Sequence, residues 1–244
     1  MPKFFLEVSY RGTAYSGFQV QENANSIQAE IEKALALLHR FPFSLTGSSR
    51  TDAGVHALQN YFHFDAATIH PQTVYKLNAI LPKDISVRRI DQMPDDAHSR
   101  FDAVSREYEY HIHQFKDPFQ NGLSYYYPYH LNLDLLQEAA ALIKTYSDFS
   151  SFAKSNSQVK NFQCIIYNSE WHVNKETLIY HIKGNRFLRG MVRLITGSLL
   201  KVGRGKMSLD HFRMMIQNRS KAGFSVPADG LYLKAVNYPE NYFP

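Results

Sequence analysis

Apolar and polar residues alternate at the start of the chain, which is the pattern of a β strand. Phe4, Leu6, Val8 and Tyr10 fall on one face of this strand. After a turn over residues 12–17, a helix is predicted with Ser26 at its N-cap. Its apolar stripe consists of Ile27, Ile31, Ala34, Leu35 and Leu38. We therefore expect this helix to pack on a sheet.

A second alternating run follows at residues 58–65. Leu58, Phe62 and Phe64 are predicted to share its buried face. The chain then becomes polar and is interrupted by three prolines, Pro71, Pro82 and Pro94. A weak point near residues 100–104 separates this half from the next.

The second half repeats the order of strand, helix, strands and helix. In the strand at residues 106–113, Tyr108 and Tyr110 lie on one face, and His111 and His113 lie on the other. Further strands are predicted at 162–171, 178–183 and 230–236, and helices at 133–146, 187–202 and 209–217. The helix at 187–202 is apolar except for Arg189 and Arg193, which are expected on one face.

These elements predict an α+β architecture of two related halves. The boundary places residues 1–103 in an N-terminal half and residues 104–244 in a C-terminal half. Strands connected by short turns favour mainly antiparallel sheets flanked by helices.

Composition indicates an ordinary globular protein of the cytoplasm. The 244 residues are 44% hydrophobic and 20% charged, which is enough apolar material for a substantial core. No apolar run approaches the roughly 20 residues that span a bilayer, and no signal-peptide pattern opens the chain. Cys164 is the single cysteine and is expected in the core, which excludes an intrachain disulfide and a thiolate metal cluster.

Positive charge is concentrated between residues 183 and 221. This stretch holds ten basic residues and one acidic residue, Asp210, although the net charge of the whole chain is only +5. In a chain with 16 tyrosines and 17 phenylalanines, such a stretch favours a nucleic acid over a membrane as partner. The alternative is a solvated basic face.

The strongest local signal is the segment Ser49-Arg50-Thr51-Asp52-Ala53-Gly54-Val55-His56-Ala57. It predicts a tight turn between sheet elements, in which Asp52 either caps the turn or projects a carboxylate into a cleft. The flanking Arg50 and His56 favour the second role, because a capping aspartate needs no cationic neighbours.

With further motifs in the same order, this segment resembles the TruA family of transfer RNA pseudouridine synthases. The other motifs are Gly17-Phe18-Gln19, Arg100-Phe101, Arg106-Glu107-Tyr108-Glu109-Tyr110, Asp148-Phe149-Ser150-Ser151-Phe152, Phe187-Leu188-Arg189-Gly190-Met191-Val192-Arg193 and Gly230-Leu231-Tyr232-Leu233. The set spans nearly the whole chain.

The resemblance implies a pseudouridine synthase fold with an active-site cleft between the halves. It implies that Asp52 is the nucleophilic aspartate, that Tyr108 lies against the target base and that Arg193 is the basic partner of the aspartate. It also implies a homodimer that binds the anticodon stem-loop and modifies uridines conventionally numbered 38, 39 and 40, without a cofactor.

The residue inventory suits this chemistry. Breaking and remaking the bond to C1′ needs a carboxylate near that carbon and a wall that holds the freed base. Asp52 either forms a covalent adduct or takes a proton on a glycal pathway, and the sequence leaves both open. A charge in a closed cleft needs a partner, which Arg193 supplies, with Arg50 as the next candidate.

Several residues have alternative interpretations. Tyr108 and Leu231 are either substrate contacts or core residues. Phosphate contact is the expected role of four basic residues, with plain solvation as the alternative: Arg186, Arg189, Arg204 and Lys206. His111 and His113 share a strand face but lack a third ligand nearby, so no metal site is expected. The alternative function is a non-catalytic RNA-binding protein, against which a carboxylate in a basic cleft argues.

Overall fold

The computed structural model describes residues 1–154, 159–174 and 176–244. Two compact units make up the fold: unit 1 comprises Met1–Val104 and Leu233–Pro244, and unit 2 comprises Ser105–Tyr232. Nine strands and five α helices occur in the described residues. None of these helices is long and apolar enough to cross a lipid bilayer.

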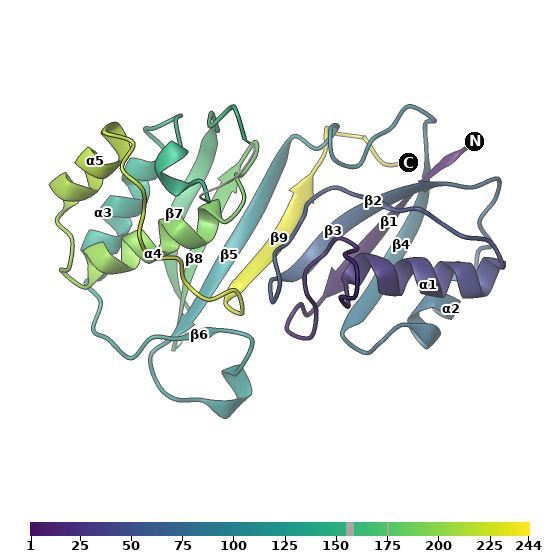
Figure 1. Cartoon of the computed structure of the whole chain (residues 1–244), viewed down its shortest axis with the longest axis horizontal. Coiled ribbons are helices and arrows are strands. Elements are labelled where there is room, and N and C mark those ends of the chain that lie inside the picture. The colour runs from purple at the N-terminus through teal and green to yellow at the C-terminus, as the bar shows by residue number, and fades with distance from the viewer. Residues whose placement is uncertain (155–158, 175) are drawn as a thin grey trace. The chain divides into compact units, whose positions relative to one another are not determined.

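Unit 1 packs two helices on one face of an antiparallel sheet (Figure 1). The strand order is β4-β1-β3, and the short β2 pairs with β3. The strands are β1 (Lys3–Tyr10), β2 (Thr46–Gly47), β3 (His56–Asp65) and β4 (Ile85–Met93), and the helices are α1 (Ile27–His39) and α2 (Thr73–Ile80). As predicted, the Ser26 side chain caps α1 by accepting a hydrogen bond from the Ala29 amide.

The prediction for the buried face of β3 is wrong at Leu58, which is 42% exposed. The pairing of β1 with β3 shifts register between Val8 and Tyr10, whose partners are Asn60 and Ala57. This bulge inserts an extra residue into β3 and changes which side chains face inward. Ala57 and Asn60 are therefore buried, and from Asn60 to Phe64 the side chains on both faces of β3 are buried, so the expected alternation does not hold there.

The segment that the sequence marked only as polar and proline-rich is ordered secondary structure. Helix α2 begins two residues after Pro71 and ends before Pro82, and β4 ends immediately before Pro94. Prolines bound these elements rather than interrupt them, because each lies at an end where no backbone N–H is needed.

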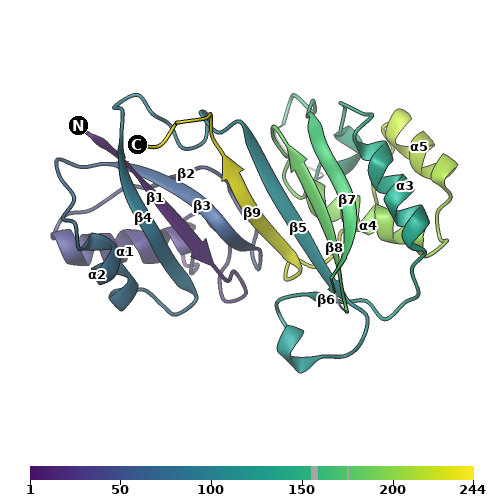
Figure 2. The same ribbon diagram turned by 180° about the vertical axis from the view of Figure 1, so that it is seen from behind.

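In unit 2, three helices accompany strands that pair in the order β5-β8-β7. The strands are β5 (Ser105–His113), β6 (Tyr125–Tyr126), β7 (Ile166–Asn174) and β8 (Thr177–Gly184), and the helices are α3 (Leu133–Ile143), α4 (Met191–Gly203) and α5 (Leu209–Gln217). The main pairings are antiparallel as expected, whereas β6 pairs parallel to β5. Helix α4 lies in front of β8 in Figure 1, and in the reverse view of Figure 2 the strands lie in front of α4.

The expectation that Arg189 and Arg193 share one helical face is wrong. Helix α4 begins at Met191, and its N-cap Gly190 has a φ of 72°, a left-handed conformation that suits glycine. Arg189 therefore precedes the helix, and the predicted start at residue 187 is four residues too early.

The last strand, β9 (Leu231–Asn237), begins in unit 2 and continues into unit 1. Residues 233–244 thus belong with the N-terminal unit, whereas the sequence analysis put them in the C-terminal half. Their contacts explain the difference: Val104 donates to the Asn237 carbonyl, the Tyr238 hydroxyl donates to the Ser99 carbonyl, and Tyr238 packs on Phe5. Sequence order could not reveal this return of the chain.

His63 is a titratable group in the core of unit 1. Its Nδ1 accepts a hydrogen bond from the Ser99 amide at 3.2 Å, so this nitrogen carries no proton. Burial, with the nearby His98 as a smaller cause, lowers the pKa of His63 to about 4. The imidazole is therefore neutral in the folded protein and protonated in the unfolded chain at pH 5.

We predict that His63→Gln flattens the dependence of stability on pH. Between an unfolded pKa near 6.5 and the folded value, the unfolded chain binds the proton, so the free energy of unfolding falls as the pH falls. From pH 7 to pH 5 this loss is about 2 kcal/mol for the His63 contribution in the wild type. Urea unfolding of both proteins at the two pH values measures it, and an equal pH dependence in both would contradict the assignment.

Candidate active site

The loop that carries Asp52 is held by a buried hydrogen-bond network. Asn60 is fully buried, and its Nδ2 donates to the Ser49 carbonyl at 3.1 Å and to the Tyr10 hydroxyl at 3.2 Å. The Tyr10 hydroxyl in turn lies 2.8 Å from the Thr51 Oγ1. Thr51 is thus tied to β1 and β3, which fixes the backbone on the N-terminal side of Asp52.

Two glycines allow a second loop to pack against this one. A Cβ on Gly12 would lie 2.0 Å from the Val55 carbonyl oxygen, and a Cβ on Gly17 would lie 3.1 Å from the Thr51 carbonyl oxygen. Gly17 also has a φ of 113°, which side-chain-bearing residues rarely adopt. The Phe18 amide then donates to the Thr51 carbonyl at 3.1 Å. The backbone next to Asp52 is therefore held by contacts with β1, with β3 and with the loop at residues 12–17.

Asp52 itself is half-buried, and Arg50 beside it is exposed. His56 is 1% exposed, and its Nδ1 accepts a hydrogen bond from the Gly12 amide at 3.1 Å. This hydrogen bond anchors the loop at residues 12–17. Because Nδ1 accepts the bond, it carries no proton, and His56 is not a cation. The interpretation of His56 as a cationic neighbour of Asp52 is therefore wrong.

In unit 2, the two tyrosines of β5 have different environments. Tyr110 is fully buried and its hydroxyl donates to the Pro227 carbonyl at 2.9 Å, so it belongs to the core. Tyr108 is only half-buried, and its ring meets that of Phe187 edge to face at 5.0 Å between centroids. A half-buried ring retains area against which another planar group can pack.

Arg193 is half-buried in the first turn of α4. Its Nε donates to the Val226 carbonyl at 2.7 Å, and the Val226 amide donates back to the Arg193 carbonyl at 3.3 Å. This side-chain bond uses Nε, and the two terminal nitrogens of the guanidinium carry further donors. Leu231, at the start of β9, is 6% exposed and packs as a core residue.

Arg204 and Lys206 line a pocket of about 330 Å³ that was not predicted from the sequence. The other lining residues are Tyr125, Tyr127, Tyr129, Lys201 and Phe224. The Arg204 guanidinium lies 3.4 Å from the centroid of the Tyr129 ring, and Tyr127 and Tyr129 meet edge to face. Cations next to exposed aromatic rings can engage both the phosphates and the bases of a nucleic acid.

Arg186 and Arg189 are also exposed, but they lie in the segment before α4 and not among the residues that line this pocket. The signal for the missed residues was the run of closely spaced tyrosines at 125–129. Its pairing with α4 could not be predicted, because it depends on how β6 and the end of α4 are brought together.

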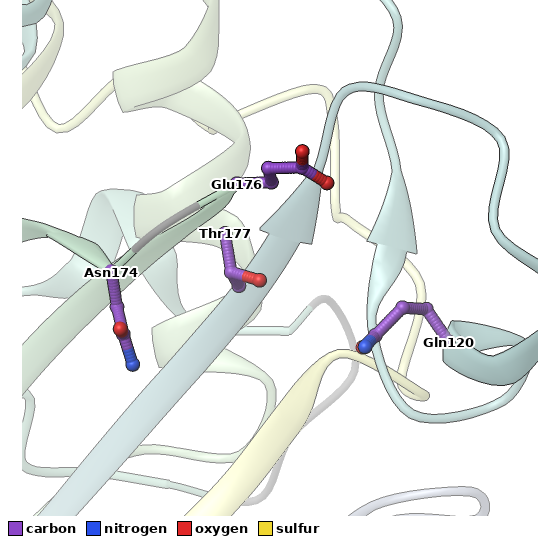
Figure 3. Close-up of a pocket in the computed structure, with 4 residues that line it drawn as sticks. All are labelled: Gln120, Asn174, Glu176 and Thr177. Carbon is purple, nitrogen blue, oxygen red and sulfur yellow. The ribbon is translucent and has the colours of Figure 1, made fainter.

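Another pocket, of about 390 Å³, lies near the end of the β7–β8 hairpin (Figure 3). Gln120, Asn174, Glu176 and Thr177 line it, and none of them is a predicted site residue. His111 pairs with Glu109 at 3.0 Å, and within the described ranges neither His111 nor His113 joins a group of three candidate metal ligands.

Comparison with known proteins identifies the family. Residues 7–102 and 141–239 match the family model described as tRNA pseudouridine synthase. The chain belongs to the tRNA pseudouridine synthase family. Pseudouridine synthases are isomerases, and this family member is therefore an isomerase.

Relatives of similar length carry the same name. The chain is 43% identical over 249 residues to tRNA pseudouridine synthase A of Parabacteroides distasonis, which covers 100% of this chain and 99% of the relative. It is 44% identical to the protein of that name from Bacteroides fragilis, covering 99% and 98%, and 36% identical to the one from Staphylococcus aureus, covering 98% and 92%.

The family match includes Asp52 and Arg193 but not Tyr108, which lies between the two matched segments. The tyrosine-rich run at 125–129 also lies outside them. The family match therefore assigns no role to these tyrosines, and a role for them has to be argued from their surroundings in unit 2.

We predict that Gly12→Ala disturbs the Asp52 loop. The new Cβ would overlap the Val55 carbonyl oxygen, and relieving such overpacking costs about 1–3 kcal/mol. The free energy of unfolding, measured in urea, should fall by this amount. Gly223→Ala is the matched control, since nothing lies within 4 Å of its new Cβ. Equal stabilities of the two variants would show that the loops are not in tight contact.

Proposed function

We propose that this protein isomerises uridine to pseudouridine in the anticodon stem-loop of tRNA, at positions 38, 39 and 40, with Asp52 as the catalytic carboxylate. Family membership, with Asp52 inside the matched region, is the observation that carries the proposal. The relatives named tRNA pseudouridine synthase A, which match over nearly their whole length, support tRNA as the substrate.

The local geometry supports Asp52 as the reacting group. A nucleophile or base must be held in a fixed orientation, and Asp52 lies on a loop fixed through Thr51, Gly17 and His56. Its half-buried position leaves it open to a nucleotide while removing part of its hydration. An aspartate that only caps a turn does not need its loop to be held by this many contacts.

The reaction that we assign is balanced without an oxidant or an energy source. The bond between N1 of uracil and C1′ breaks, the base turns, and a bond forms between C5 and C1′. C5 loses a proton and N1 gains one, so the product is an isomer of the substrate. Asp52 either bonds to C1′ or takes a proton from the sugar in a glycal route, and both routes use one carboxylate.

Two residues of unit 2 are proposed to complete the site. The half-buried ring of Tyr108 offers a stacking surface for the freed uracil. Arg193 is proposed to pair with the Asp52 carboxylate through its terminal nitrogens, because a carboxylate enclosed over a base is costly without a cation. Arg50, which is exposed, is proposed as a further substrate contact, whereas Leu231 is assigned to the core.

The exposed cations are proposed to hold the RNA backbone. Arg186, Arg189, Arg204 and Lys206 are exposed cations, and Arg204 and Lys206 border the tyrosine pocket. On the family resemblance, we also propose that the enzyme acts as a cytoplasmic homodimer and that its reaction uses no metal or cofactor.

We predict that Asp52→Asn removes turnover and leaves RNA affinity nearly unchanged. The amide keeps the shape of the side chain but cannot act as nucleophile or base, so the rate should fall by orders of magnitude. The measurement is mapping of pseudouridine in unmodified tRNA incubated with purified enzyme. Asp65→Asn, at the exposed end of β3, is the control and should keep the wild-type rate.

A rate above about a tenth of wild type in Asp52→Asn would remove Asp52 from the catalytic role. Absence of pseudouridine formation by the wild type, together with tight tRNA binding, would instead favour the non-catalytic RNA-binding protein. Pseudouridine at sites other than 38, 39 and 40 would correct the stem-loop assignment alone.

We predict that alanine replacement of Arg189, Arg204 or Lys206 weakens tRNA binding and that Arg193→Ala slows the chemical step. Each lost phosphate contact should lower the slope of log affinity against log salt by about one. Lys33→Ala, on the exposed side of α1, is the control cation and should change neither quantity. Filter binding at several salt concentrations and single-turnover rates at saturating tRNA provide the two measurements.

A normal single-turnover rate in Arg193→Ala, with only weaker and less salt-sensitive binding, would make Arg193 another phosphate contact. The partner of Asp52 would then be sought at Arg50.

A further inference from the structure

The sheet of unit 2 has a second face, which carries polar and ionisable side chains. Along β7 and β8, Trp171, Tyr180 and Ile182 are buried, while the residues between them point to the opposite side. The Ser169 hydroxyl, on the buried side, donates to the Ala140 carbonyl of α3. The polar face therefore points away from α3. Glu107 of β5 lies on this polar face, and Tyr108, the next residue of the strand, lies on the other face.

Three candidate metal ligands gather on this face: Glu170 and His172 of β7 and His181 of β8. Their ligand atoms all lie within 4.8 Å of one another. Glu170 and His181 are direct cross-strand partners, and His172 follows Glu170 by two residues on the same face. The Oε1 of Glu170 lies 3.1 Å from the Nε2 of His172. The three groups thus converge because of strand pairing.

The hydrogen bonds around His181 determine which of its nitrogens is available. Asn168 Nδ2 lies 3.3 Å from His181 Nδ1, and Glu107 Oε2 lies 3.3 Å from His181 Nε2. The orientation of the Asn168 amide is fixed, since its Oδ1 accepts from the Ser169 amide and its Nδ2 donates to Glu170 at 2.6 Å. An NH₂ group donates and a carboxylate accepts, so Nε2 bears the proton and Nδ1 presents a lone pair.

This arrangement is the one found around metal-binding histidines. A metal-ligating histidine commonly donates its second ring N–H to a carboxylate, which fixes the tautomer and the ring orientation. Glu107 occupies that position for His181, and Lys183, at 2.9 Å from Glu107 Oε1, holds the carboxylate in place. The lone pair of His181 Nδ1 therefore already faces the side on which Asn168 and Glu170 lie.

Charge and exposure also suit an ion. The carboxylate of Glu170 accepts a hydrogen bond from Asn168 at 2.6 Å and lies 3.1 Å from His172, so it offers an anionic ligand beside the two imidazoles. The side chains of His172 and Glu170 are 54% and 37% exposed, whereas that of His181 is 12% exposed. An ion can approach from solvent past the exposed side chains of His172 and Glu170, which can move, and reach His181, which is held in place by Glu107.

We propose that Glu170, His172 and His181 bind a divalent zinc-type metal ion, which joins β7 to β8 outside the reaction site. Two imidazoles and one carboxylate are a donor set that Zn²⁺ accepts, with water as the fourth ligand. Coordination requires Asn168 to release both Glu170 and the Nδ1 of His181. The two exposed side chains must also move inward, because ligands at about 2.1 Å from zinc lie closer together than 4.8 Å.

Zinc titration of the dialysed, tag-free full-length protein against a chromophoric chelator tests this proposal. One ion per chain should bind the wild type, and His172→Ala or His181→Ala should weaken the affinity at least tenfold. Zinc should also raise the midpoint of thermal unfolding of the wild type, since an ion that binds only the folded state stabilises it, and should raise that of His172→Ala much less. Glu107→Gln should weaken binding about tenfold or more, as expected for a residue that positions a ligand.

His111→Ala is the matched control. His111 pairs with Glu109 at 3.0 Å on the same face but has no third candidate ligand within the described part of the chain, so its loss should leave zinc affinity unchanged. Absence of saturable binding by the wild type, or equal affinities of the wild type and His172→Ala, would overturn the proposal. Because His172 is exposed, its replacement tests the site even if His181→Ala fails to fold. These readouts do not depend on pseudouridine formation.

Discussion

The hydrogen-bond network of Asn60 is the constraint on which the candidate active site depends. Its buried side chain accepts from Ser48 and Tyr61 and donates to Tyr10 and Ser49, so all of its hydrogen-bonding groups are used. A buried polar group that is fully satisfied specifies one arrangement, because any other would leave a donor or acceptor unpaired at a cost of about 1–3 kcal/mol. Through Tyr10 and Thr51, this requirement fixes the loop that presents Asp52.

The proposed reacting groups are each positioned by their own unit. Asp52 depends on packing within unit 1, whereas Arg193 is clasped to Val226 by a pair of hydrogen bonds within unit 2. The backbone that carries Asp52 and the side chain of Arg193 are thus each held by contacts within their own unit. A guanidinium held in this way loses little side-chain freedom when a ligand arrives, which lowers the entropic cost of binding.

Strand β5 connects the two proposals for unit 2 through the alternation of its side chains. Tyr108, on one face, is assigned to the base, and Glu107, on the other, orients His181. A strand in a sheet covered on one face has this property, since successive residues point in opposite directions. The chemistry of the reaction and the proposed binding of metal can therefore change independently through substitutions at neighbouring positions.

The sequence by itself determined the elements whose signals are local. The Ser26 cap, the apolar stripe of α1, the strand character of β5 and the ordered family motifs around Asp52 all lie within short segments. Tertiary structure alone decided the inward face of β3, where a bulge buries Asn60 and exposes Leu58, and the return of residues 233–244 to unit 1. It also gave His56 its accepting role and brought Tyr129 to Arg204 and His181 to Glu170. These features depend on register, close backbone approach and contacts between distant segments, which residue spacing along one segment does not encode.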